Sequence, residues 1–304
     1  MEQKSMTALV SAFARAYHSL NNKVKIFDDS VARQLLTDDE YRQIAQSMSG
    51  GIGFFNPSFQ GNSEQALRWI VDNQLSPSPL GRAAFAEQSL ERAVRVGAKQ
   101  YLIFGAGYDT FAYRQPSWAQ SLQIFEIDHP MTAEDKWERL KTAGIVIPDN
   151  VHFIEADFAK EGWQQALLNH AAFSSGKISC CTILGVAYYL SKECFASLVF
   201  TISGMTAKGS SLVFDYPDEN SYTDKAGQRA KKQAMLAGAA NEKMLASYSY
   251  SEIEQLLASY GFLIYEHLTP KDMTEQYFDA YNQANPLHPM TAFDNVNDCL
   301  AVKN

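Results

Sequence analysis

The stretch Ile103-Phe104-Gly105-Ala106-Gly107-Tyr108-Asp109-Thr110, followed some twenty residues later by Phe125-Glu126-Ile127-Asp128, decides the fold of this chain. An apolar run that ends in a tight glycine loop, and a second apolar run that ends in an acidic residue, are typical of the first half of a nucleotide-binding unit. The two glycines let a backbone approach a ligand closely and permit positive φ. The pattern therefore predicts a cofactor site, but it does not by itself identify the cofactor.

The composition excludes several classes of protein. The chain has 304 residues, 46 % of them hydrophobic and 20 % charged, with a net charge of −8. An acidic chain without a dense lysine and arginine run argues against binding nucleic acid or an anionic membrane. No apolar run reaches the length of a membrane span, and the first residues lack a signal-peptide core. Four cysteines without a CxxC pair favour a cytoplasmic protein with no metal site.

Alternating apolar strands and helices extend through the last two thirds of the chain. Helices are expected between the strands, at 132–142, 163–169, 192–206 and 251–260. Because strand and helix alternate at this spacing, the fold class is α/β, a doubly wound, mostly parallel, Rossmann-like sheet covered on both faces. The seven expected strands are 100–104, 122–127, 151–155, 178–184, 211–214, 262–265 and 298–302.

The first 97 residues are predicted to be mostly helical. Expected helices cover 5–20, parts of 28–48, 64–73 and 82–96, with Gly97 as the C-cap of the last. The Ser76-Pro77-Ser78-Pro79 segment is expected to end the third of these helices. The sequence thus divides into a helical cap at 1–97 and a cofactor-binding core at 98–304.

Two residues of the glycine loop argue against a dinucleotide. The third position of the GxGxxG pattern should be small, yet Thr110 stands there. Asp109 would place a negative charge where a pyrophosphate binds. S-adenosylmethionine, which has no phosphate, fits better. Asp128 could then hold the ribose diol and Asp157, at the end of the third strand, could face the adenine; alternatively, both only cap the following helices.

At this point the sequence resembles the leucine carboxyl methyltransferase family. Residues 100–114, QYLIFGAGYDTFAYR, are similar to its block QVVxLGAGxDTRxYR, and residues 125–130, FEIDHP, to FEVDxP. Residues 185–190, GVAYYL, resemble EGVxxYL, and residues 23–29, KVKIFDD, resemble RxxFFDD. The resemblance covers roughly residues 20–215 and implies a class I S-adenosylmethionine-dependent methyltransferase fold.

The resemblance also assigns residues to the cofactor. It places Gly105, with Gly107, under the methionine part of S-adenosylmethionine, and Asp128 on the ribose. Arg82, with Lys23 or Lys25 as a second cation, would pair with the cofactor carboxylate. The adenine would be read by Asp157 and the backbone of Phe158, which stands where the family often has leucine.

The sequence departs from the family at two positions. Phe111 replaces the arginine of the DTR motif, and Leu184 replaces the acidic residue before Gly185. The second change removes a carboxylate expected near the cofactor's amino group. Glu126 is one substitute, although it is equally consistent with a solvent-exposed residue at the strand edge.

Candidate catalytic residues lie at the ends of later strands. Tyr188 and Tyr189 follow the fourth strand and should face the reacting centre, unless they only pack there. Asp215 ends the fifth strand and could line the acceptor pocket, and His288 could act as a base, unless it is a solvated loop histidine. The aromatic residues expected to shape that pocket from the cap, where ordinary helix packing is the alternative, are Phe27, Phe54, Phe55 and Trp69.

Together these features predict an O-methyltransferase that uses S-adenosylmethionine to methylate a carboxylate or hydroxyl of a small molecule. The alternatives are a methyltransferase of protein C-terminal carboxylates, an NAD-dependent oxidoreductase, and a cofactor-binding homologue that has lost catalysis. The helical cap is also a candidate homodimer surface.

Overall fold

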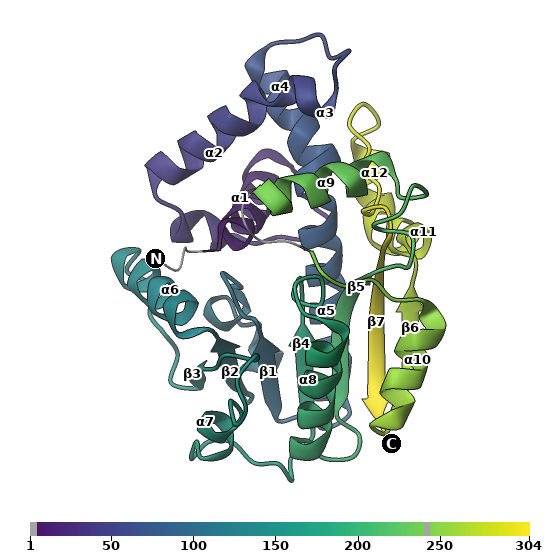
Figure 1. Ribbon diagram of the computed structural model, residues 1–304. Coiled ribbons are helices and arrows are strands. Elements are labelled where there is room, and N and C mark those ends of the chain that lie inside the picture. The colour runs from purple at the N-terminus through teal and green to yellow at the C-terminus, as the bar shows by residue number, and fades with distance from the viewer. Residues whose placement is uncertain (1–4, 240–243) are drawn as a thin grey trace.

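The computed structural model describes residues 5–239 and 244–304, and a seven-stranded sheet lies at its centre (Figure 1). The strand order is β3-β2-β1-β4-β5-β7-β6; β7 runs antiparallel to β5 and β6, and the other pairs are parallel. This confirms the predicted doubly wound, mostly parallel α/β fold. The strands are β1 Gln100–Phe104, β2 Gln123–Asp128, β3 Val151–Glu155, β4 Ser179–Ile183, β5 Ser211–Pro217, β6 Phe262–Leu268 and β7 Val296–Lys303.

The central strand β1 is buried along its whole length. Tyr101 and Ile103 pack on one face of the sheet, together with residues of α5 (Pro77–Arg95). Leu102 and Phe104 pack on the other face, against residues of α8 (Lys192–Met205) and α10 (Tyr250–Ser259). Successive side chains of a strand point to opposite faces, so an unbroken apolar run is what a strand covered on both sides requires.

The remaining helices surround this three-layered core (Figure 1). Capping boxes mark the start of two helices: Thr37 and Glu40 form one on α2, and Ser249 and Glu252 form one on α10. The helices not yet named are α1 Met6–Asn21, α2 Asp38–Gly50, α3 Ile52–Phe55, α4 Ser63–Ile70, α6 Pro130–Thr142, α7 Gln165–Leu168, α9 Gln228–Ala239, α11 Pro270–Met273 and α12 Asp279–Ala284.

The segment Ser76–Pro79 differs from its prediction. It was expected to end a helix, but Pro77 and Pro79 lie in the first turn of α5. Proline fits there because the first amides of a helix have no intrahelical partner to lose. Leu80, Phe85 and Leu90 of α5 then pack against the sheet. This helix therefore covers the core, although its sequence falls within the predicted cap.

The cap is formed mainly by α1, α2 and α4, with one contribution that the sequence did not predict. Phe13, Leu35 and Ile44 form its own small core. The unpredicted part is α9, which comes from the second half of the chain and crosses toward the cap in Figure 1. Lys232 of α9 donates a 2.7 Å hydrogen bond to the carbonyl of Phe55, so α9 and the cap helices are joined directly.

Three further observations concern the described residues. None of the described helices is long and apolar enough to cross a membrane. Within the same residues, no group of three or more His, Cys, Asp or Glu side chains is arranged to hold a metal ion. The cysteines are all free thiols, and Cys180, Cys181 and Cys299 are buried in the sheet.

Candidate active site

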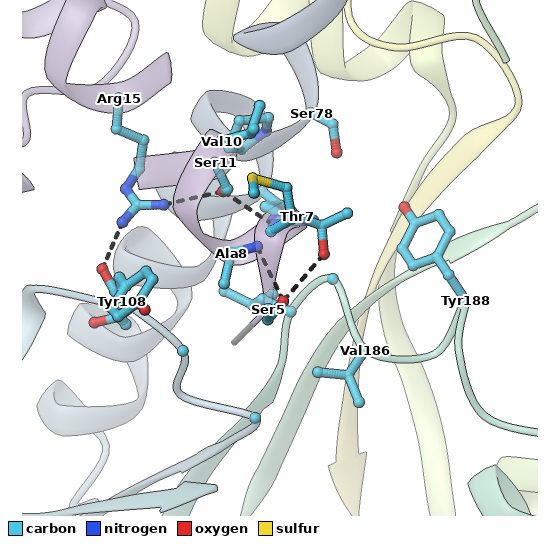
Figure 2. A pocket seen from close by; sticks show the side chains of 18 of the residues that line it. Ser5, Thr7, Ala8, Val10, Ser11, Arg15, Ser78, Tyr108, Val186 and Tyr188 are labelled. Carbon is cyan, nitrogen blue, oxygen red and sulfur yellow. Dashed lines mark hydrogen bonds between the residues drawn. The ribbon is translucent and has the colours of Figure 1, made fainter. Parts of the chain in front are cut away.

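A cavity of about 920 Å³ opens where the strands of the sheet end below the cap. The loops after β1, β2 and β4 form its floor, and α1, the start of α5 and α9 form its walls. In Figure 2, α1 lies across the cavity, with Tyr108 on one side and Val186 and Tyr188 on the other. Ligands of doubly wound sheets bind at this edge, beyond the carboxyl ends of the strands.

The glycine loop forms the floor as predicted. Gly105 and Gly107 both have positive φ, +72° and +47°, and the amide of Gly105 donates to the carbonyl of Ile127 at 2.8 Å. A Cβ added at Gly105 would come within 2.4 Å of Val186. The loop therefore requires glycine at 105 for both conformation and space, and its bare backbone faces the cavity.

Asp128 lines the cavity at the end of β2. One carboxylate oxygen accepts the amide of Gly107 at 2.6 Å and the other accepts the amide of His129 at 2.7 Å. Burial raises the pKa of this carboxyl, and the two amides partly offset the effect. Each oxygen keeps a second lone pair, so the carboxylate can still accept the two hydroxyls of a ribose.

Arg82 of α5 reaches the cavity beside the loop that follows β4. Its guanidinium donates to Asp215 at 3.2 Å, and a Cβ at Gly185 would come within 2.5 Å of it. Asp215 is fully buried at the end of β5 and also accepts the hydroxyl of Tyr188 at 2.8 Å. Arg82 is therefore a cation held at the cavity wall by a buried carboxylate.

Asp215 also contacts the residue next to Leu184. Its second oxygen accepts the backbone amide of Gly185 at 2.6 Å, but Asp215 itself does not line the cavity. Glu126, the substitute suggested by the sequence, is not at the site. It is buried within β2, where it pairs with Lys136 at 2.8 Å and accepts the hydroxyl of Tyr113.

Several predicted site residues lie outside the cavity. Lys23 is exposed in the loop after α1, and His288 is exposed in the loop after α12; neither lines the cavity. Asp157 does not line it either, because its carboxylate turns back to the amide of Ala159 at 3.1 Å and to Lys160. The neighbouring Phe158 does line the cavity, as do Tyr188 and Tyr189.

Of the four aromatic residues of the cap that were predicted to shape the acceptor pocket, two line the cavity and two do not. Phe27 and Phe55 line the cavity, whereas Phe54 and Trp69 do not. Phe54 instead packs edge-on against Phe55 at the surface. The cap therefore contributes two of the four predicted aromatic side chains to the cavity.

One polar cluster was not predicted from the sequence. Asp29 is buried at the cavity wall and accepts Arg15 at 2.8 Å and the hydroxyl of Thr110 at 2.6 Å. Arg15 also donates to the carbonyl of Tyr108 at 2.6 Å (Figure 2), and Arg114 lies 3.6 Å from Asp29. The acidic end of the KVKIFDD segment could have indicated this, because Asp29 ties α1 to the glycine loop.

The residues present fit S-adenosylmethionine. The loop at Gly105 exposes backbone to the cavity, Asp128 offers acceptors for the ribose, and Arg82 offers a cation for a carboxylate. The aromatic ring of Phe158 supplies an apolar surface for a base. These four residues would hold the cofactor, with Asp157 outside the set.

Comparison with known proteins identifies the family and the same cofactor. The sequence model of the family described as Leucine carboxyl methyltransferase matches residues 8–203. A Bacillus subtilis (strain 168) protein named "Putative S-adenosyl-L-methionine-dependent methyltransferase YktD" is 41 % identical over 306 residues, which cover 99 % of this chain and 98 % of that protein. A Saccharopolyspora erythraea protein with the same description is 27 % identical and covers 69 % of this chain and 66 % of its own.

Two solved structures share the fold. A DUF574 family protein from Streptomyces avermitilis superposes with a TM-score of 0.62 at 12 % identity, covering 97 % of each chain. A "putative methyltransferase" from Thermobifida fusca gives a TM-score of 0.55 at 15 % identity, covering 99 % of this chain and 96 % of that one. With the family match over most of the sequence, the oxidoreductase alternative is wrong: the chain belongs to the leucine carboxyl methyltransferase family and is an S-adenosylmethionine-dependent methyltransferase.

Proposed function

We propose that the protein transfers a methyl group to an oxygen, either a carboxylate or a hydroxyl, of a small molecule that binds beneath the cap. The supporting observation is the size of the cavity. At about 920 Å³ it lies near the upper end of the range of roughly 300–1,000 Å³ in which single drug-sized ligands bind. A cofactor on the glycine loop would leave space for a second small molecule under α1 and α9.

The chemistry asks little of the protein beyond alignment. Bound S-adenosylmethionine supplies a methyl group already activated by its sulfonium. The chain must hold the acceptor oxygen in line and keep water away, and proximity of this kind supplies much of the rate enhancement. Apolar side chains of the cap and α9, among them Met48, Phe55 and Leu236, line the cavity and serve the second task.

Tyr188 fits the role of a positioning donor better than that of a base. Its hydroxyl donates to the buried carboxylate of Asp215, and burial raises its pKa well above the usual value. The phenol therefore stays protonated and holds the wall of the cavity in place. A carboxylate acceptor, which needs no base, suits such a site directly; a hydroxyl acceptor must lose its proton during or after transfer.

A product analysis tests this function. Purified protein is incubated with S-adenosylmethionine and a mixture of small acids, alcohols and phenols, and methylated products are identified by mass spectrometry. Mild base hydrolyses methyl esters but leaves methyl ethers intact, which separates carboxylate from hydroxyl acceptors. Gly105→Ala, expected to distort the glycine loop, is the matched control. Transfer only to nitrogen or sulfur, or only to a protein C-terminus, would contradict the proposal.

A further inference from the structure

The acceptor side of the cavity contains a polar group that the cofactor site does not explain. Gln74 lines the cavity, the residue as a whole is only 9 % exposed, and among the described residues its carboxamide has no hydrogen-bond partner. The amide is therefore free to pair with a molecule in the cavity. A ligand that covers it without offering a hydrogen bond would leave it unpaired, which costs free energy.

An irregular turn of the backbone holds Gln74 at this position. Gln74 lies in a single π-helical turn, Val71–Leu75, between α4 and α5. Such turns interrupt the regular hydrogen-bond pattern of a helix and are frequent at functional sites. Here the amide of Ser76 bonds to the carbonyl of Val71 at 2.9 Å. The widened turn holds Gln74 in the cavity wall between two regular helices.

A second carboxamide comes from α9. Gln233 of α9 also lines the cavity and likewise has no hydrogen-bond partner in the part of the chain that is described. The π-helical turn and α9 pack against each other, and Arg229 donates to the carbonyl of Asn73 at 3.2 Å. Both amides therefore belong to one wall, formed by segments about 160 residues apart in the sequence.

The side chains that line the cavity near this wall are largely apolar. The side chains that line the cavity from the cap and α9 include Met48, Phe55, Leu75 and Leu236. The charged residues that line it come from α1, the Asp29 segment, α5 and the glycine and β2 loops, and each acidic or arginine side chain among them is engaged within the protein. A charged group under α9 would lose its water without finding a counter-ion, which is costly.

Some apolar residues of the cavity also reach the surface. Among the described large apolar residues that line it, Met6 is 45 % exposed, Met131 37 % and Leu236 39 %. Apolar side chains are therefore accessible to an apolar molecule from solvent.

From these observations we infer that the methyl acceptor has an uncharged, apolar body and, away from its reacting oxygen, a neutral carbonyl, hydroxyl or amide group that pairs with the carboxamide of Gln74, with Gln233 beside it. The inference rests on the proposed function for the identity of the reacting oxygen only. The pairing itself is a property of the cavity and is measured by binding, without turnover.

Four phenols of one ring size serve as probes: 4-hydroxyacetophenone with a neutral carbonyl, p-cresol with none, 4-hydroxybenzenesulfonate with a negative charge that is not a carboxylate, and tyramine with a positive charge. Their affinities are measured by titration calorimetry on the full chain saturated with S-adenosylhomocysteine. We expect 4-hydroxyacetophenone to bind at least tenfold more tightly than each of the other three, since a site built for a hydrogen bond rejects ligands that lack it.

Substitution of the glutamine tests the assignment. Gln74→Leu should abolish the preference for 4-hydroxyacetophenone over p-cresol and leave the melting temperature unchanged or higher, because no partner within the described protein is lost. A merely structural glutamine would lower it. Gln46→Leu, on the exposed face of α2, is the control and should change neither value.

The outcomes separate the two proposals. Tighter binding of a charged probe, equal binding of all four, no binding of 4-hydroxyacetophenone, or an unchanged preference in Gln74→Leu would each overturn the inference. A preference that is present and lost in Gln74→Leu, together with no transfer to oxygen in the product analysis, would leave the inference standing and contradict the proposed function alone.

Discussion

The carboxylate of Asp215 accepts the backbone amide of Gly185 at 2.6 Å. This bond links the end of β5 to the loop after β4, at the position where the family motif has an acidic side chain and this chain has Leu184. The other oxygen of Asp215 binds Arg82 and Tyr188. One buried carboxylate thus fixes the loop, the cation and the phenol that border the cavity, and it does so from behind the wall.

Asp215→Asn is expected to weaken cofactor binding. Asparagine can still accept the amide of Gly185, but it leaves the charge of Arg82 without its partner. Breaking a buried pair by removing one charge typically costs about 3 to 5 kcal/mol. The dissociation constant of S-adenosylhomocysteine, measured by calorimetry, should rise by roughly tenfold or more as Arg82 becomes mobile. An unchanged constant in a folded variant would contradict the role of Asp215.

A second carboxylate should partly replace Asp215 as the partner of Arg82. Asp298 of β7 lies opposite Asp215 in the sheet, and burial, then the charge of Asp215, raises its pKa well above the usual value. When Asp215 becomes neutral, Asp298 can ionise and pair with Arg82 instead. Asp298→Asn should therefore destabilise the Asp215→Asn variant more than it destabilises the wild type. Urea denaturation of the four proteins in this cycle should give a coupling of about 1 kcal/mol or more, and additive effects would contradict the argument.

Gly105→Ala should lower the free energy of unfolding by more than backbone strain alone would. Gly105 and Gly144 have similar φ, +72° and +67°, but a Cβ at 105 would come within 2.4 Å of Val186, whereas nothing lies within 4 Å at 144. Alanine at positive φ costs about 1 to 2 kcal/mol at either position. We expect Gly105→Ala to lose a further 1 to 3 kcal/mol through the clash and to bind S-adenosylhomocysteine weakly. Thermal melts with and without that ligand measure both effects, and equal behaviour of the two variants would exclude the steric argument.

The sequence predicted the sheet and the glycine loop because both depend on local signals. The strands are apolar runs, and the glycine loop and Asp128 lie within thirty residues of one another. The Asp215–Gly185 bond was not predictable in this way, since it joins two strand ends whose side-by-side position only the fold determines. Lys23 and His288, predicted from a degenerate motif and from residue type, lie outside the cavity, because neither signal reports burial.

The contribution of α9 to the cap was not predicted, for a physical reason. Only Ala230 and Ala237 of α9 are buried, so the helix lacks the broad apolar stripe from which an amphipathic helix is predicted. It is held instead by polar contacts to distant carbonyls. The position of Gln74 was likewise not predicted, because a π-helical turn leaves no recognisable pattern of apolar and polar residues.

Stability should fall in mild acid because of His18. This histidine is completely buried in α1, and burial, reinforced by the charges of Arg68 and Lys25, lowers its pKa from 6.5 to about 4. Between pH 6.5 and about 4 the histidine is protonated in the unfolded chain but not in the folded chain. The stability present above pH 6.5 is therefore lost as the pH falls toward 4. The loss should be roughly 3 kcal/mol. Urea denaturation at several pH values should show a shallower decline in His18→Gln, while His288→Gln, an exposed site, should follow the wild type.

The position of α9 should depend on one arginine. Arg229 donates to the carbonyls of Asn73 and Ala292 and pairs with Asp294, which ties α9 to the π-helical turn and to the segment before β7. Arg229→Gln removes these charge-assisted bonds. We expect faster proteolytic cleavage within α9 and an acceptor KM raised several-fold, with the affinity for S-adenosylhomocysteine unchanged, because α9 faces the acceptor side of the cavity. Lys231→Gln, on the same helix and bonded only to the carbonyl of Asp224 among the described residues, is the matched control. A parallel loss of cofactor affinity in Arg229→Gln would mean that α9 supports the whole site rather than the acceptor wall.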